Sequence, residues 1–296
     1  VVYIAAYKIY YTRGIYMTIK ECYLRGIIPK DLPIIDAHGH LGDYSSIFIR
    51  QLPLKEAIAF SNSLGIKQIA ASSLTAIGGK LKLGNSELFK SIDQYPDNLL
   101  GYVYYNPNYI EESLLDINTY KDHPNFAGVK IHPRDCGAHL LDPGYEPLWE
   151  LSDKEGIAIS CHTWEGEPAN SPALFYSIME RYPQMIIILA HCGGTYRGYQ
   201  DSYRLAHQYP NIYLDINGWL YSATWIEDVI ENAGEDRVLF GTDQMFNDPR
   251  ISLGRIVLSD LTDEQKRKIL AGNFLRIMSM RRKKSSQIPN STGRCR

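Results

Sequence analysis

The residues most able to do chemistry are two histidines separated by one residue, in the segment Asp36-Ala37-His38-Gly39-His40. An apolar run, residues 33–35, leads into this segment. Because alternate residues of a strand share a face, Asp36, His38 and His40 should point the same way at a strand tip. Two residues of rise span roughly 6.6 Å, so two imidazoles can converge on one metal ion. A lone pair of this kind is equally compatible with core packing, so residues farther along must decide.

Residues of metal-ligand type also end several later apolar runs. The runs at 157–161 and 186–190 are almost purely hydrophobic, and each is followed at once by a histidine. Such a set at strand ends is hard to obtain by chance. Three or four nitrogen and oxygen ligands with an open position are typical of a catalytic Zn²⁺ or a similar ion. The residues concerned are Lys130, His132, His162, His191 and Asp243.

Eight short apolar runs of strand length alternate with amphipathic stretches of helical spacing. The runs occupy 33–38, 66–73, 99–105, 126–132, 157–162, 185–191, 212–216 and 238–242. Runs rich in Ile, Val, Leu or Tyr are typical of buried parallel strands. We therefore predict an α/β protein with a (β/α)₈ TIM barrel, whose site lies at the C-terminal ends of the strands. A doubly wound open sheet is the alternative, but no Gly-x-Gly-x-x-Gly fingerprint follows an early strand.

Two helix starts carry side chains suited to capping. Asn85 precedes an amphipathic stretch at 86–94 and is expected to cap it. Thr262 and Gln265 have the spacing of a capping box, which predicts a helix that runs toward Leu270.

The composition is that of a globular protein with a large core: 296 residues, 45% hydrophobic and 22% charged. The five cysteines are widely spaced and form no Cys-x-x-Cys pair, which indicates reduced thiols in a cytoplasmic protein. No apolar run has the length that a membrane span needs. We therefore expect a cytoplasmic location and no membrane partner.

The two ends of the chain differ from its middle. Residues 1–32 are expected to form an N-terminal extension, in which 1–16 lack a signal-peptide pattern and precede the first methionine, Met17. We interpret 1–16 as upstream or accessory sequence. Residues 281–296 carry six basic residues and no acid, and are expected to form a disordered tail. The remaining 1–280 then hold 25 basic and 33 acidic residues, a net charge of −8 that argues against a nucleic-acid partner.

Taken in order, these motifs resemble the amidohydrolase superfamily. More narrowly, the chain is similar to the amidohydrolase-related branch that includes aminocarboxymuconate semialdehyde decarboxylase. The resemblance covers roughly 33–280 and implies a single barrel domain there, a small-molecule substrate and a homodimer. The segments that carry it are Asp36-Ala37-His38-Gly39-His40, Gly128-Val129-Lys130-Ile131-His132-Pro133, His162, Ala190-His191-Cys192-Gly193-Gly194 and Gly241-Thr242-Asp243.

The resemblance also implies a division of roles around one divalent ion, expected to be Zn²⁺, with Mn²⁺, Fe²⁺ and Co²⁺ as alternatives. His38, His40, His162 and Asp243 would bind the ion. His191 would act as a general base or a further ligand, and Asp243 would also hydrogen-bond the reacting water. Metal binding lowers the pKa of bound water toward ~7, and a neutral His191 can accept or steer its proton.

Other residues near these strand ends are candidates for substrate contact. In some amidohydrolases a carboxylated lysine on the fourth strand bridges two metals. For Lys130 we expect instead a lysine that pairs with Asp36 or binds an anionic substrate. Arg134 could hold a substrate carboxylate in a bidentate manner. The remaining candidates are His132, Trp164, Glu165 and Asn217.

The same ligand set supports two reactions, so motif and fold alone do not decide between them. Our main expectation is a hydrolase in which metal-activated water attacks a small amide, ester or lactone. The alternative is a non-oxidative decarboxylase or related lyase, which needs a cationic grip on the substrate carboxylate from Lys130 or Arg134. A non-enzymatic metal-containing binding module is a third reading. It fits poorly, because structural zinc sites are closed and rich in cysteine.

Overall fold

The computed structural model describes residues 10–12, 15–44, 52–218, 222 and 224–287. In this part of the chain eight parallel strands form one sheet, ordered from β3 to β10 along the sequence. The strands are β3 (Ile35–Leu41), β4 (Gln68–Ser73), β5 (Leu99–Tyr104), β6 (Phe126–Ile131), β7 (Ala158–His162), β8 (Ile186–Ala190), β9 (Ile212–Asp215) and β10 (Val238–Leu239).

Backbone hydrogen bonds bring the first and last of these strands together. The Ala37 N–H donates to the Phe240 carbonyl at 2.9 Å, and the Asp243 N–H donates to the His38 carbonyl at 2.7 Å. A further parallel bridge joins Gly39 to Gln244. The sheet is therefore a nearly closed cylinder, and the predicted (β/α)₈ TIM barrel is confirmed.

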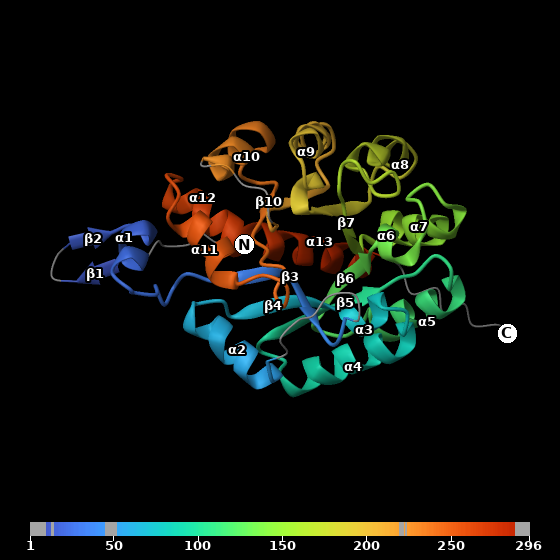
Figure 1. The fold of residues 1–296 in the computed structure, drawn as a ribbon, viewed down its shortest axis with the longest axis horizontal. Coiled ribbons are helices and arrows are strands. Elements are labelled where there is room, and N and C mark those ends of the chain that lie inside the picture. Colours follow the sequence, from blue (N-terminus) through green and yellow to red (C-terminus); the bar gives the residue numbers. More distant parts are fainter. Residues whose placement is uncertain (1–9, 13–14, 45–51, 219–221, 223, 288–296) are drawn as a thin grey trace.

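Helices cover the outside of the barrel (Figure 1). In that view α2, α4 and α5 lie along one side, and α8, α9 and α10 lie along the opposite side. The longer helices are α2 (Leu54–Ser63), α4 (Leu81–Gln94), α5 (Ile110–Tyr120), α7 (Glu146–Glu155), α8 (Phe175–Arg181), α9 (Tyr196–Gln208), α10 (Trp225–Ala233), α11 (Pro249–Val257) and α13 (Asn273–Gln287). Shorter ones are α1 (Ile19–Leu24), α3 (Leu74–Ile77), α6 (Pro133–Cys136), α12 (Asp263–Arg267), the 3₁₀ turns η1 (Pro143–Tyr145), η2 (Pro172–Leu174) and η3 (His191–Gly193), and the π-helical η4 (Lys268–Gly272).

Apolar side chains fill the barrel from its N-terminal end. Ile35, Leu100 and Ile188 point into one buried cluster, which Phe274 and Ile277 of α13 complete. A larger cluster fills the layer between the strands and the surrounding helices. With both of these layers apolar, the polar residues that follow the strands collect at the C-terminal end, where barrels of this kind carry their sites.

The two expected helix caps have different outcomes. The capping box is confirmed at the start of α12, where the Gln265 N–H donates to the Thr262 hydroxyl at 3.2 Å and the Thr262 N–H donates to Gln265 Oε1 at 2.9 Å. The expected Asn85 cap is wrong, because α4 already begins at Leu81 and Asn85 lies inside it. Asn85 instead exchanges two hydrogen bonds with the backbone of Tyr104 in β5, at 2.9 and 3.1 Å.

A hairpin of β1 (Tyr10–Thr12) and β2 (Ile15–Met17) leads into α1, which lies beside α11 and α12 (Figure 1). The Ile19 N–H donates to the Asp263 carboxylate at 3.1 Å, and Lys20 Nζ lies 2.5 Å from Asp260 Oδ1. The start of the described chain is thus attached to the side of the barrel. The expected tail at 281–296 needs correction, because α13 continues through 281–287; 1–9, 13–14 and 288–296 lie outside the described residues.

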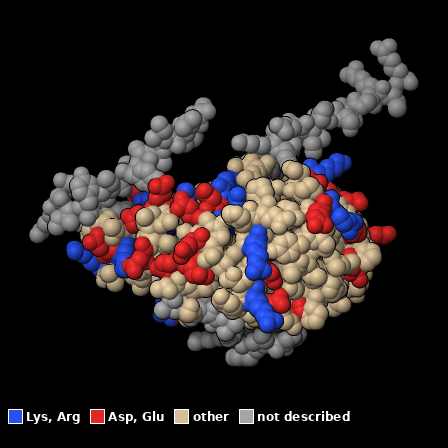
Figure 2. Space-filling model, turned by 90° about the horizontal axis from the view of Figure 1, so that it is seen from above, with Lys and Arg blue, Asp and Glu red and all other residues tan. Residues whose placement is uncertain are grey.

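Membrane and charge features can be read from the same structure. No helix within the described ranges combines the length and apolarity needed to cross a membrane. On the face drawn in Figure 2, acidic and basic side chains are interspersed among uncharged residues.

Candidate metal centre and active-site cavity

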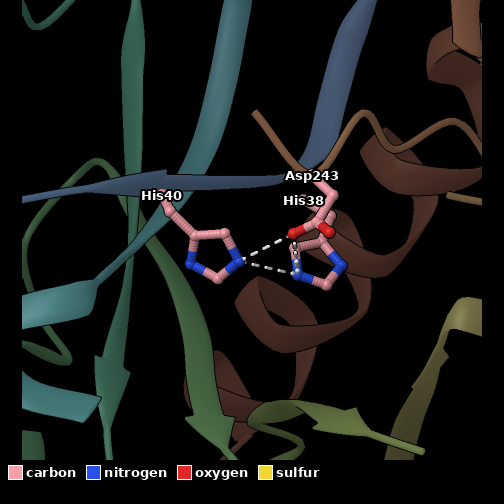
Figure 3. Close-up of side chains that lie close together, drawn as sticks. All are labelled: His38, His40 and Asp243. Atoms are coloured by element: carbon pink, nitrogen blue, oxygen red, sulfur yellow. Dashed lines mark hydrogen bonds and ion pairs between the residues drawn. The ribbon is translucent and has the colours of Figure 1, made fainter. Parts of the chain in front are cut away.

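Two histidines and an aspartate converge at the C-terminal end of the barrel. His38 and His40 come from the end of β3, and Asp243 follows β10 (Figure 3). His38 Nε2 lies 3.2 Å from His40 Nε2, and Asp243 Oδ1 lies 3.0 Å from His40 Nε2 and 3.7 Å from His38 Nε2. A tetrahedral ion with bonds of about 2.05 Å separates its ligand atoms by about 3.3 Å. The three side chains are therefore spaced as ligands of one ion.

The two histidines of this trio are each held from behind by another side chain. His38 Nδ1 lies 2.5 Å from Asp215 Oδ2, and His40 Nδ1 lies 3.0 Å from the Ser72 hydroxyl. Asp243 has a left-handed backbone conformation (φ 58), which aspartate tolerates better than most residues. Hydrogen bonds to the second nitrogen of a ligating histidine fix its tautomer and orientation. The candidate ligand atoms are thus pre-positioned by the fold.

Asp36 does not line the cavity; its hydrogen bonds connect parts of the barrel wall. Its carboxylate accepts hydrogen bonds from the Thr242 hydroxyl at 2.5 Å, the Gln244 amide at 2.8 Å and the His38 N–H at 3.0 Å. Burial raises its pKa to about 7, although these hydrogen bonds favour the charged form. Asp36 therefore ties β3 to the segment after β10, and the strand register shifts between Asp36 and Gly39. The expectation that Asp36 faces the same way as the two histidines is not met.

Lys130 of β6 reaches the metal centre from inside the barrel. It is 1% exposed, and its Nζ lies 3.1 Å from His38 Nε2. The expected partner Asp36 is not its hydrogen-bond partner. Burial lowers the pKa of Lys130, while the nearby carboxylates of Asp243 and Asp215 act in the opposite direction.

Three further histidines form the other half of the site, and we call His132, His162 and His191 the imidazole group. The rings of His132 and His162 stack with centroids 3.9 Å apart, and the ring of His191 meets that of His162 edge-on at 4.7 Å. Among the residues that the structure describes, none is a hydrogen-bond partner of the buried His132 Nδ1, His162 Nε2 or His191 Nδ1. Burial lowers the pKa of all three, that of His191 to about 4, so their rings are neutral at pH 7. Neutral imidazoles with unused nitrogens can bind a metal ion or substrate.

A cavity of about 240 Å³ connects the two halves. An apolar cavity of roughly 150 Å³ already accepts benzene, so this one is large enough for a substituted six-membered ring. Its walls combine the polar groups above with aromatic and apolar side chains. The lining residues are His38, His40, Tyr44, Leu74, Ile77, Lys130, His132, Arg134, Asp135, His162, Trp164, His191, Asp243 and Phe246.

Arg134 is at the rim of this cavity between two carboxylates. Its Nε donates to Asp135 at 3.1 Å, and its Nη1 donates to Glu167 at 3.0 Å. Asp135 also accepts a hydrogen bond of 2.5 Å from the Tyr44 hydroxyl. The predicted cation is thus beside the cavity, but its charge is already shared with two acids.

Of the other expected substrate contacts, one lines the cavity and two do not. Trp164 lines the cavity, with its ring parallel to that of His162 at 6.3 Å. Glu165 does not line it, and its carboxylate accepts a hydrogen bond of 2.5 Å from Ser171. Asn217 does not line it either; its Nδ2 lies 2.6 Å from His38 Nδ1 and 2.5 Å from Asp215 Oδ2. Asn217 therefore lies behind His38, next to Asp215.

Sequence reasoning missed Asp215, Ser72, Tyr44 and Asp135. Asp215 and Asn217 alternate at the end of the seventh apolar run, and this spacing could have marked them as a pair on one strand face. Nothing in the local sequence singles out Ser72 or Tyr44, whose roles depend on strands and loops that meet only in the barrel.

The residues present fit a divalent cation. His38, His40 and Asp243 offer ligand atoms that all lie within 4.8 Å of one another, and all three residues are buried. His162, the fourth expected ligand, lies outside this trio; it lines the same cavity, and its Nε2 lies 4.0 Å from Glu167 Oε2. Nitrogen and oxygen donors of this kind suit zinc, manganese, iron or cobalt.

Residues 35–277 match the amidohydrolase family, so this chain belongs to that family. It is also similar to a 2-amino-3-carboxymuconate-6-semialdehyde decarboxylase of Dictyostelium discoideum, with 21% identity over 236 residues. That alignment covers 66% of this chain and 65% of the relative, so the matched region spans just under two thirds of the relative's length.

Solved structures with the same fold include two decarboxylases. A 2,6-dihydroxybenzoate decarboxylase from Rhizobium superimposes with a TM-score of 0.64 and 18% identity, covering 84% of this chain and 99% of its own. A dihydroxybenzoic acid decarboxylase from Polaromonas sp. JS666, which contains manganese and the inhibitor 2-nitroresorcinol, gives 0.64 and 17%, covering 84% and 97%.

These findings confirm the resemblance and the expectation of a metal-dependent enzyme. They agree better with the alternative of a decarboxylase than with the main expectation of a hydrolase, because the named relatives are decarboxylases.

Proposed function

We propose that this protein is a metal-dependent, non-oxidative decarboxylase of a small carboxylic acid. The observation that carries the proposal is the lysine beside the metal centre: Lys130 Nζ lies 3.1 Å from His38 Nε2, inside a cavity with aromatic walls. A cation next to a metal site suits a substrate carboxylate, and the decarboxylase relatives support the same reading.

His38, His40 and Asp243 would hold the ion, and His162 would complete the set with its unpartnered Nε2. When bound, the ion would stabilise negative charge that develops on a substrate oxygen. We propose Zn²⁺ or Mn²⁺, since both suit imidazole and carboxylate donors and since manganese occupies the Polaromonas relative.

Decarboxylation breaks the bond between carbon and the carboxylate, releases CO₂ and leaves an electron pair that must take up a proton. His191 is suited to handle that proton, because its buried ring is neutral and its Nδ1 has no partner in the described structure. A neutral imidazole carries one N–H donor and one acceptor nitrogen, so it can deliver a proton and recover another.

The walls of the cavity favour a planar substrate. The stacked rings of His132 and His162, with Trp164 parallel to them, offer flat faces to a ring or a conjugated acid. The cavity volume of about 240 Å³ limits the substrate to about one ring with its substituents. A hydroxylated aromatic acid or a conjugated carboxylic acid meets both conditions.

The test is to measure CO₂ release from a panel of such acids by the metal-loaded protein. The panel contains 2,6-dihydroxybenzoate, 5-carboxyvanillate and 2-amino-3-carboxymuconate 6-semialdehyde, with His40→Ala as the inactive control. Metal-dependent CO₂ release that the control lacks supports the proposal. No CO₂ from any acid, with turnover of amides or lactones instead, overturns it.

Hydrolysis remains the second candidate, because it uses the same ligands and a base in the position of His191. The two reactions have different products. A hydrolase consumes one water per turnover and releases no CO₂, so a parallel screen of small amides, esters and lactones separates them.

A further inference from the structure

We propose that Asp215 is a positioning residue for the metal centre: it accepts the Nδ1–H of His38 and thereby directs Nε2 of that ring toward the ion. The inference rests on the proposed role of His38 as a metal ligand. It assigns Asp215 a role in metal affinity and geometry without direct contact with the ion.

The contact between the two side chains is short and shielded from water. Asp215 Oδ2 lies 2.5 Å from His38 Nδ1, Asp215 is 0% exposed and His38 is 2% exposed. Asp215 is the last residue of β9, and its register partner is Leu239 in β10. The carboxylate therefore enters from the strand next to the one that precedes Asp243.

The contact determines which nitrogen of the His38 ring carries the proton. A neutral ring carries its proton on one nitrogen and its lone pair on the other. A carboxylate that holds the proton on Nδ1 leaves the lone pair on Nε2, and it also increases the basicity of that nitrogen. Nε2 of His38 is the atom that faces His40 Nε2 and Asp243 Oδ1.

Asn217 holds the carboxylate in this orientation. Its backbone N–H donates to Asp215 Oδ1 at 3.2 Å, and its side-chain amide donates to Asp215 Oδ2 at 2.5 Å. The other ligand histidine, His40, has only the neutral hydroxyl of Ser72 at its Nδ1. Charge-assisted hydrogen bonds are roughly twice as strong as neutral ones. The hydrogen bond that orients His38 is therefore stronger than the one that orients His40.

Gly241 leaves the space that the pair requires. A Cβ atom added at Gly241 would lie 2.1 Å from Asp215 Oδ1 and 3.0 Å from the Cβ of His38. Real Cβ contacts do not occur at 2.1 Å, so any side chain there must displace the carboxylate. Gly241→Ala therefore disturbs the same contact without removing a polar atom.

The experiment measures Zn²⁺ affinity by competition with a chromophoric chelator in the wild type and in Asp215→Asn. We expect the variant to bind Zn²⁺ 10–100-fold more weakly, the range typical for loss of such a supporting hydrogen bond. Asp116→Asn is the matched control, because Asp116 is also a buried aspartate, bonded to Asn85 between α4 and α5. The control should bind Zn²⁺ as the wild type does.

A second measurement uses the wild type alone. In the zinc-loaded wild type, NMR should show the Nδ1–H of His38 as a slowly exchanging, strongly low-field proton signal. Equal affinities in wild type and Asp215→Asn, or a His38 proton without this low-field shift, overturn the inference. If the wild type binds no Zn²⁺ at all, the proposed metal centre fails instead, which is a different result.

Discussion

The two halves of the cavity are built in opposite ways. On one side, His38, His40 and Asp243 are fixed by hydrogen bonds from neighbouring strands, such as those of Asp215 and Ser72. On the other side, the imidazole group is buried and its rings are in contact, and within the described part of the chain one nitrogen on each ring has no hydrogen-bond partner.

The two halves thus differ in hydrogen bonding: the side chains of one half have partners within the protein, and each ring of the other half has a nitrogen without one among the described residues. Buried polar atoms without partners are costly, and among the described residues three such nitrogens surround one cavity, which makes them candidates to bind a ligand. The fixed half has the spacing and donor atoms of a candidate metal site. In the proposed reaction, the other half would contact the ion through His162 and the substrate through the other two rings.

The largest effect should come from the fixed half. His40→Ala removes one of the three clustered ligands, and we expect loss of tight metal binding and a fall in kcat/KM of about 10³-fold or more, since the ion contributes several kcal/mol to transition-state stabilisation. Elemental analysis and CO₂ release measure the two effects. His123→Ala is the control, because His123 binds Asp93 on the outside of the barrel. A variant that keeps both metal and activity would contradict the division into halves.

The next effect should come from the imidazole group. His191→Gln removes the ring proposed to handle the proton, and we expect kcat to fall by about 10²–10⁴-fold. The metal content should stay near the wild-type value, because His191 lies outside the clustered trio. Loss of the metal together with activity would show that His191 is a ligand and would move it to the other half.

Lys130 lies between the two halves of the cavity. Its removal tests whether the charge at this position binds the substrate carboxylate. Lys130→Met keeps an unbranched side chain of nearly the same length but loses the charge. A hydrogen bond to a charged group contributes about 1.5–3 kcal/mol, so kcat/KM for a carboxylate substrate should fall about 10–100-fold. If activity on carboxylates is unchanged while the metal is retained, Lys130 does not bind the substrate.

The smallest effect concerns stability and pH. Burial lowers the pKa of His191 from about 6.5 to about 4, so between these pH values the unfolded state binds a proton that the folded state does not. Stability therefore falls as the pH drops through this window. Between pH 7 and 5, His191→Gln should lose about 2 kcal/mol less unfolding free energy than the wild type. Urea titrations with a chelator present measure this, and equal losses would mean that the ring is not buried in its neutral form.

Much of the fixed half could be predicted from sequence, because strand alternation brings His38 and His40 together and each strand end marks a possible ligand. The partners Asp215 and Ser72 could not, since they come from other strands and meet the histidines only when the barrel closes. Sequence suggests that Arg134 could hold a substrate carboxylate, but it does not reveal that Asp135 and Glu167 already share the charge of this side chain. The helix caps show the same limit: the local capping box was predictable, whereas Asn85 reaches across to β5.

The most direct test of the central claim is the metal content of protein reconstituted with Zn²⁺ or Mn²⁺, compared between the wild type, His38→Ala and His162→Ala. The account predicts one ion per chain in the wild type, none in His38→Ala and a weakened site in His162→Ala, because the ion joins the two halves. Absence of metal from the reconstituted wild type would contradict the account, as would two ions per chain.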